Sequence, residues 1–338
     1  MKFIEESYGR ELYTELKNAF SDAVPEATVA LKGAGVHWNC TVKRGDRHCT
    51  IHCFDVKGPE YLMSFDHQKE TSAMGRTASQ ADTIMAARIW IEGREVPELH
   101  RQFQFVDKQK RSLSSIEATA ISICPELGST TRELKHQICD QYDLWFRETD
   151  RSCRLFYYGK NLHPDAVFHW DGCRLFTVQT GDNIYLARLL KKWLCDHVMP
   201  SVLQREFPEI EMSKAASYYE AGRGIEGEFV ETWDRIEEFY AEMNFPPAEE
   251  IRSLVKAMRA KGYDRTLRAG QSMYTLMLSR SRRHGLRQGQ PHIAFQFREG
   301  GMGVVVSNLP GKSIESSKLR LTDPVITLLE EMAGVAID

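Results

Sequence analysis

The sequence predicts an α+β fold of antiparallel β-meanders, each packed by helices, followed by a C-terminal helix-plus-hairpin unit. Three observations favour this class. Runs in which apolar and polar residues alternate recur in series, and each series is followed by a run with helical periodicity. The dipeptides Gly45-Asp46 and Asp171-Gly172 lie between alternating runs, as tight hairpin turns do. The chain has 338 residues, more than one core usually supports, so we expect several domains.

The first expected domain, residues 1–125, contains a helix followed by a meander. Apolar residues one helical turn apart predict an amphipathic helix over 4–22, which Pro25 ends. From 29 to 66 the period falls to two, which predicts strands on both sides of Gly45-Asp46.

A capped helix follows this meander. Ser79 precedes Asp82 by three residues and is followed by an apolar run that reaches Ile91. This is the pattern of a helix N-terminus at which a side-chain oxygen accepts a backbone N–H. Gly93 is expected to end the helix.

The second expected domain, residues 126–221, repeats the order of strands and then a helix. A stripe of leucines with Trp193 predicts one long helix from about 182 to 205. A tryptophan followed by Asp-Arg-x-Cys occurs in both domains, at Trp38 and at Trp145, which raises the hypothesis of a divergent duplication. Alternating runs predict strands near 132–139, 143–148, 153–159, 166–170 and 173–179.

The third expected domain, residues 222–338, starts at a linker predicted by Gly222, Gly224 and Gly227. The elements expected after the linker are an acidic helix over 228–242, helices near 248–260 and 267–284, a hairpin that turns at Gly300-Gly301 and a last helix that starts near Thr322.

Composition argues against several classes of protein. Glu5 and Glu6 stand where a secretory signal needs its apolar core, and no window approaches about 18 uninterrupted apolar residues. The eight cysteines are scattered and form no CxxC pair, which favours free thiols over disulfides or a zinc ribbon. We therefore expect a cytoplasmic protein with no membrane contact and no resident cofactor.

Charge is distributed unevenly along the chain. Residues 251–320 carry 14 Lys and Arg against 3 Asp and Glu, although the whole chain has a net charge of −3. Such a segment in an otherwise acidic protein indicates a basic patch.

A dense basic run inside this segment is the first candidate binding site. Five cationic or titratable groups within eight residues could neutralise several phosphates of a nucleic acid or another ligand. Alternatively, the run ends a helix just before Gly285, where the helix dipole stabilises cations, or it pairs with the acidic helix 228–242. The run consists of Arg280, Arg282, Arg283, His284 and Arg287.

Arg76 and Thr77 form a second candidate phosphate site, because they directly precede the helix capped at Ser79. The free N–H groups and positive dipole end of a helix N-terminus favour an anion.

The candidate catalytic residues are Asp55 and Lys57. An acid-x-Lys triplet at a strand end suits a metal-dependent nuclease, in which the carboxylate would hold Mg²⁺ and the lysine would orient the attacking water. Asp55-Val56-Lys57-Gly58 resembles the half-motif of the restriction-endonuclease-like family, and this resemblance implies a second acid upstream. Asp46 is nine residues earlier on the same strand, roughly 30 Å away at about 3.3 Å per residue, so that acid is not identified.

Three functions follow from these patterns. The first is a non-catalytic protein that binds nucleic acid or another phosphate-bearing ligand through the basic C-terminal segment. The second is a metal-dependent nuclease or phosphodiesterase that uses Asp55 and Lys57 with Mg²⁺. The third is a protein–protein adaptor or homo-oligomer, in which the acidic and basic segments contact each other or a partner subunit.

Overall fold

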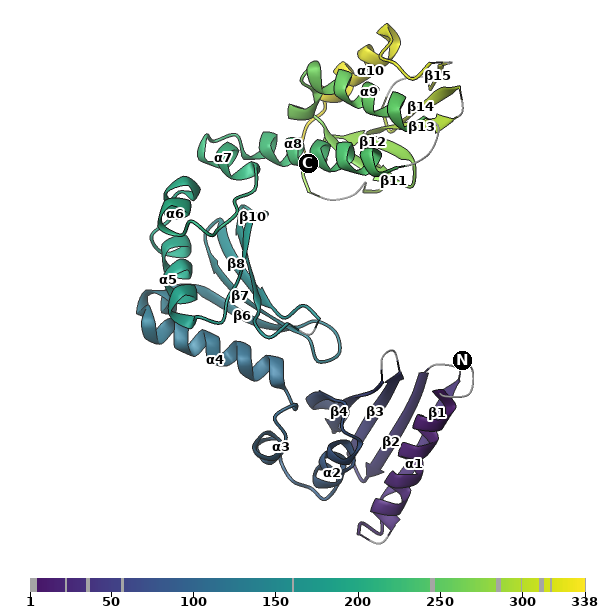
Figure 1. Ribbon diagram of the computed structural model, residues 1–338, viewed down its shortest axis with the longest axis vertical. Helices are drawn as coiled ribbons and strands as arrows, with labels where there is room; N and C mark the ends of the chain where they lie inside the picture. Colours follow the sequence, from purple (N-terminus) through teal and green to yellow (C-terminus); the bar gives the residue numbers. More distant parts are fainter. Residues whose placement is uncertain are drawn as a thin grey trace. The chain divides into compact units, whose positions relative to one another are not determined.

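The fold is α+β, with helices packed on antiparallel meanders (Figure 1). Within the described residues the chain forms ten α-helices and three five-stranded antiparallel sheets. Each sheet is a meander, because its strands lie side by side in chain order. The computed structural model describes residues 5–21, 23–34, 37–55, 58–159, 161–243, 247–283, 287–298, 300–309, 313–316 and 318–337.

The chain divides into two compact units. Unit 1 comprises residues 1–166 and 178–195, and unit 2 comprises residues 167–177 and 196–338. No helix among the described residues is long and apolar enough to cross a membrane.

The first meander of unit 1 has one face covered by two helices, as Figure 1 shows. Apolar residues of α1 and α2 share one core with Cys40, Cys49 and Ile51, which the strand alternation brings to the same face. The predicted turn at Gly45-Asp46 is confirmed, with Gly45 at φ +60°. The elements are α1 (Glu5–Ser21), β1 (Thr28–Ala34), β2 (His37–Arg44), β3 (Arg47–Asp55), β4 (Pro59–His67), β5 (Glu70–Thr77) and α2 (Gln80–Ile91).

The predicted N-cap of α2 is also confirmed. The Ser79 hydroxyl accepts the Asp82 N–H at 3.2 Å, so a backbone donor of the first turn is satisfied.

The second meander is preceded and followed by helices. The predicted long helix over 182–205 was wrong, because Pro200 begins a separate helix. A proline inside one continuous helix would remove a backbone hydrogen bond and clash with the preceding turn. The elements are α3 (Val96–Gln102), α4 (Lys108–Ile123), β6 (Thr131–His136), β7 (Tyr142–Glu148), β8 (Arg151–Phe156), β9 (Asp165–Trp170), β10 (Cys173–Gln179), α5 (Asn183–Leu194) and α6 (Pro200–Glu206).

An arginine and a tryptophan make the same contact twice in unit 1. The guanidinium of Arg47 lies 4.4 Å from the ring centroid of Trp90, and that of Arg151 lies 4.2 Å from the ring centroid of Trp193. In both pairs the indole N–H donates to the carbonyl of the residue after the arginine, at 3.1 and 3.3 Å. Each pair thus joins the start of a strand to the helix that follows its meander.

The third meander lies in unit 2 and packs against three helices in one core. The predicted hairpin at Gly300-Gly301 is confirmed, and so is the last helix, whose N-cap residue is Thr322. The elements are α7 (Ala215–Glu220), α8 (Gly224–Glu242), α9 (Ala248–Ala260), β11 (Arg268–Ser272), β12 (Thr275–Ser279), β13 (His292–Arg298), β14 (Gly301–Ser307), β15 (Ile314–Ser316) and α10 (Asp323–Ala333).

Two sequence predictions for this unit were wrong. Gly224 and Gly227 lie in α8 rather than in a linker, and a Cβ on Gly227 would stand 2.6 Å from the Cβ of Tyr218, so this glycine serves close packing. The segment 267–284 forms strands β11 and β12 rather than a helix, because Leu276 and Leu278 alternate into the core.

Candidate functional site

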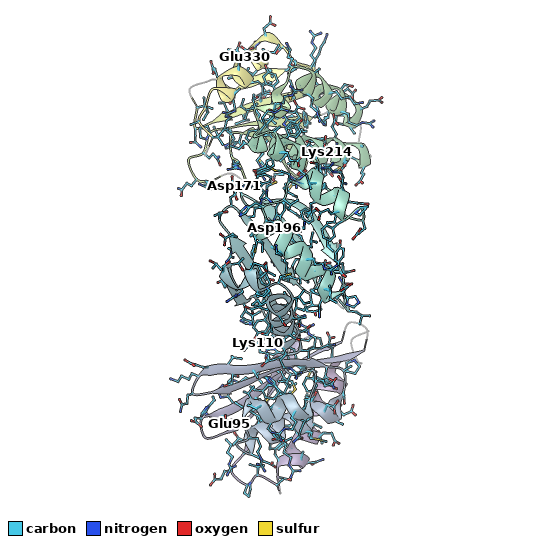
Figure 2. The ribbon with its side chains drawn as sticks, turned by 90° about the vertical axis from the view of Figure 1, so that its left-hand side faces the viewer. Glu95, Lys110, Asp171, Asp196, Lys214 and Glu330 are labelled. Carbon is cyan, nitrogen blue, oxygen red and sulfur yellow. The ribbon has the colours of Figure 1, made fainter. Side chains whose placement is uncertain are left out.

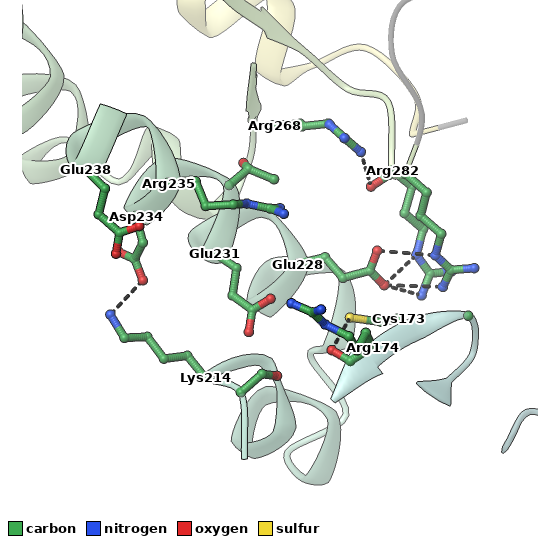
Figure 3. A pocket seen from close by; sticks show the side chains of 14 residues that line it. Cys173, Arg174, Lys214, Glu228, Glu231, Asp234, Arg235, Glu238, Arg268 and Arg282 are labelled. Carbon is green, nitrogen blue, oxygen red and sulfur yellow. Dashed lines mark hydrogen bonds and ion pairs between the residues drawn. The ribbon is translucent and has the colours of Figure 1, made fainter. Parts of the chain in front are cut away.

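A polar cavity of about 750 Å³ lies in unit 2 and is the candidate functional site (Figure 3). Its walls come from α8, the first residues of β10, the turn before α7, the start of β11 and the residues that follow β12. Six cationic side chains and four carboxylates line it. The sequence predicted only two of these cations, Arg282 and Arg283, as ligand contacts.

Arg282 and Arg283 are bound by acids of their own chain. Glu228 of α8 is 7% exposed and accepts hydrogen bonds from Arg282 at 2.9 Å and from Arg283 at 3.3 Å. The Tyr219 hydroxyl also donates to Glu228. Asp171, labelled in Figure 2, lies 2.6 Å from the Arg282 guanidinium. Burial lowers the pKa of Arg282, but the bonds and charges of these acids outweigh it and hold that pKa above its ordinary value.

The other members of the basic run do not line this cavity. The Arg280 guanidinium donates to two backbone carbonyls, those of Val335 at 2.8 Å and Thr266 at 2.6 Å, and so ties β12 to the C-terminal segment. Arg280 and Arg287 border a smaller cavity of about 210 Å³. His284 lies outside the described residues. Arg282 and Arg283 therefore follow the alternative prediction, in which the basic run pairs with the acidic helix of the same chain.

Three further arginines lie around the larger cavity. Arg268 belongs to the basic segment 251–320, whereas the sequence patterns did not single out Arg174 and Arg235. The side chains of Arg174 of β10 and Arg235 of α8 form no ion pair or hydrogen bond with any described residue, and both residues are exposed. Arg268 of β11 donates to the Arg282 carbonyl at 3.1 Å and has no carboxylate partner among the described residues. Burial lowers the pKa of Arg268, and the nearby charge of Arg235 lowers it further. Figure 3 shows all three beside the same space.

Acidic side chains of α8 form the opposite wall. Asp234 is bound by Lys214 at 2.6 Å and by Arg259 at 2.8 Å. Glu231 accepts the Ala215 N–H through one oxygen at 2.9 Å. Figure 3 shows the side chains of Asp234 and Glu238 on the side of the cavity away from Arg268, together with Lys214, whereas Glu228 lies beside Arg282.

The predicted phosphate site at Arg76 and Thr77 is occupied by bonds within unit 1. Arg76 lies 2.8 Å from Asp140 and 3.3 Å from Glu60. The Thr77 hydroxyl accepts the Ser79 N–H at 3.1 Å.

The nuclease residues are only partly described. Asp55 is the last residue of β3 and stands opposite Pro59 of β4, while its side chain and all of Lys57 lie outside what the structure describes. Among the described residues, no group of three or more His, Cys, Asp or Glu could hold a metal ion. The nuclease hypothesis therefore stays a prediction.

Comparison with known proteins adds no functional assignment, because no family model, curated protein or solved structure matches this chain.

Proposed function

We propose that this chain is a non-catalytic binding protein for a phosphate-bearing ligand, and that the cavity of unit 2 holds the phosphate. The observation that carries the proposal is the grouping of Arg174, Arg235 and Arg268 around one cavity without a carboxylate partner among the described residues. A guanidinium offers several N–H donors in a planar fork that matches phosphate oxygens.

Electrostatics supports an anion at this place. Burial and the charge of Arg235 lower the pKa of Arg268, and the charge of Glu228 opposes them only in part, so the guanidinium groups of Arg235 and Arg268 repel each other. A phosphate between them would replace this repulsion by attraction. The cavity, at about 750 Å³, falls within the range of roughly 300–1,000 Å³ typical of small-molecule sites.

The test is a binding titration at two salt concentrations with phosphate esters and with single- and double-stranded DNA and RNA. We expect the Arg174→Gln/Arg235→Gln variant to lose at least tenfold in affinity, since a hydrogen bond to a charged group contributes about 1.5–3 kcal/mol. Arg205→Gln is the matched control, because Arg205 is an exposed arginine of α6 outside the cavity.

Three outcomes would contradict the proposal. Equal affinity of the double variant and the control would remove the cavity from the binding site. Probe cleavage that needs Mg²⁺ and disappears in Asp55→Ala would favour the nuclease instead. A stable oligomer with no affinity for any phosphate compound would favour the adaptor.

A further inference from the structure

The cavity of unit 2 contains separated charges that restrict what can occupy it. Arg235 and Glu238 lie one helical turn apart on α8, yet neither forms an ion pair with a described residue. Figure 3 shows the Arg235 guanidinium directed away from Glu238 and toward the side of Arg268. A ligand that fills the cavity therefore meets both a donor, Arg235, and an acceptor, Glu238, that form no ion pair with a described residue.

We propose that the ligand is a small polyhydroxylated phosphate monoester, of the sugar-phosphate class, rather than a nucleic acid. This inference rests on the proposed function and deepens it. The phosphate lies at Arg174, Arg235 and Arg268, and hydroxyl groups of the same molecule donate to the acidic wall.

The acidic wall argues against a polyanion. A nucleic-acid strand carries one phosphate per nucleotide, so a strand with one phosphate at the arginines would bring the next phosphates close to Glu231 and Glu238. Like charges in a partly enclosed site are strongly unfavourable. A monoester places its whole charge at the arginines.

Free acceptors on this wall suit hydroxyl groups. Glu231 uses one oxygen for the Ala215 N–H, which leaves its second oxygen available, and Glu238 forms no hydrogen bond with a described residue. The hydroxyl oxygen of Ser213 is buried beside the cavity without a partner in the described part of the chain. Sugar hydroxyls both donate and accept, so they satisfy all three groups.

The rest of the lining excludes bulky apolar groups. Apart from Cys173, each described residue that lines the cavity is charged, carries a hydroxyl or is glycine. Binders of single-stranded nucleic acid usually stack bases on aromatic side chains, and none of the described lining residues is aromatic.

The experiment is a calorimetric titration with ribose 5-phosphate, ethyl phosphate, ribose, pyrophosphate and a single-stranded oligonucleotide. We expect ribose 5-phosphate to bind at least tenfold more tightly than ethyl phosphate, which carries the phosphate but lacks the sugar hydroxyl groups. Ribose alone and the oligonucleotide are expected to bind at least a hundredfold more weakly than ribose 5-phosphate.

The variant Glu231→Gln/Glu238→Gln tests the acidic wall. It should reduce the advantage of ribose 5-phosphate over ethyl phosphate to less than threefold and strengthen pyrophosphate binding, because two negative charges are removed while the side chains keep their shape. Glu242→Gln, an exposed site on the same helix outside the cavity, should change neither.

The two proposals fail in different ways. Equal binding of ethyl phosphate and ribose 5-phosphate, or tight binding of the oligonucleotide that Arg235→Gln abolishes, would overturn the sugar-phosphate inference and leave the phosphate site standing. Absence of binding by every phosphate compound would overturn the proposed function as well.

Discussion

Glu228 occupies two arginines of the basic run, Arg282 and Arg283. Its carboxylate is nearly buried and binds Arg282, Arg283 and the Tyr219 hydroxyl. The two arginines that follow β12, which would otherwise attract phosphate, are thereby directed toward α8. Arg280, Arg282 and Arg283 therefore form bonds within unit 2.

Replacing Glu228 by Gln should lower the free energy of unfolding by about 3 kcal/mol, because breaking a largely buried ion pair leaves its partners uncompensated. Urea denaturation measures this loss. Glu242→Gln provides the control, since this exposed residue of the same helix should stay within about 0.5 kcal/mol of the parent protein. Equal stability of the two variants would mean that Glu228 does not organise the cluster.

Cys173 reports on the electrostatics of the cavity. Burial raises the pKa of its thiol to about 12, and the carboxylates of Glu228 and Glu231 add to the effect. A raised pKa keeps the thiol protonated, and only the thiolate is alkylated rapidly. At pH 8.5, near the ordinary pKa of cysteine, we expect iodoacetamide to alkylate Cys173 at least tenfold more slowly in the folded chain than in urea.

The pH dependence of the alkylation rate distinguishes a raised thiol pKa from steric protection of the thiol by the fold. In the folded protein the alkylation rate, followed by mass spectrometry, should keep rising above pH 9, whereas in the unfolded chain it should level off. A folded-state rate that also levels off near pH 9 would contradict the raised pKa.

Sequence reasoning identified parts of this site but could not assemble it. Arg282 and Arg283 stand out as a dense local run, whereas Arg174, Arg235 and Arg268 come from three separate elements. Arg174 and Arg235 look like ordinary surface arginines in the sequence, and Arg268 is one of many cations in the basic segment. Only the fold brings the three to one cavity, and acids of the same chain pair with Arg282 and Arg283 of the dense run.

At the scale of elements, local signals predicted boundaries well and long-range packing poorly. The capping pattern at Ser79 and the glycine turn at Gly300 depend on neighbours in sequence, and the structure confirms both. The helix predicted over 267–284 failed because strand pairing with β13 overrides the local pattern. Pro200 is itself a local signal for a helix break, but the leucine stripe favoured one continuous helix.

The recurring arginine–tryptophan contact should be a major stabilising element of unit 1. Arg151 is 3% exposed, lies over the Trp193 ring and donates to the Trp193 carbonyl at 3.2 Å. Arg151→Ala should cost about 2–4 kcal/mol, because a desolvated cation–π contact, a hydrogen bond and packing are lost together. Arg188→Ala, at an exposed site of α5, should cost less than about 0.5 kcal/mol.

Urea denaturation followed by tryptophan fluorescence measures both variants. Arg47→Ala tests the repeated contact at Trp90 and should also destabilise the chain, although less, because the Arg47 side chain is 13% exposed. If Arg151→Ala were as stable as the Arg188→Ala control, the arginine–tryptophan contact would not stabilise unit 1.

At the scale of the whole molecule, the sequence predicted the fold class because alternation and helical periodicity repeat along the chain. The structure confirms an α+β fold of antiparallel meanders with helices packed on them, and its C-terminal part contains a five-stranded meander where only a hairpin was predicted. The function did not follow from this architecture, because a meander covered by helices defines no chemistry by itself. The charged cavity of unit 2 is the feature of the molecule that suggests a function.

A ligand in that cavity should therefore change hydrogen exchange in unit 2. Binding stabilises the folded state by about 2.7 kcal/mol when the free ligand is at a hundred times its Kd, which slows exchange through unfolding by up to about a hundredfold. With ribose 5-phosphate at this excess, we expect amides of α8 and β11 to exchange more slowly, because both elements line the cavity. Amides of β2, β3 and β4 in unit 1 should keep their rates. Slower exchange confined to unit 1, or none in either unit at saturating ligand, would show that the cavity is not where the ligand binds.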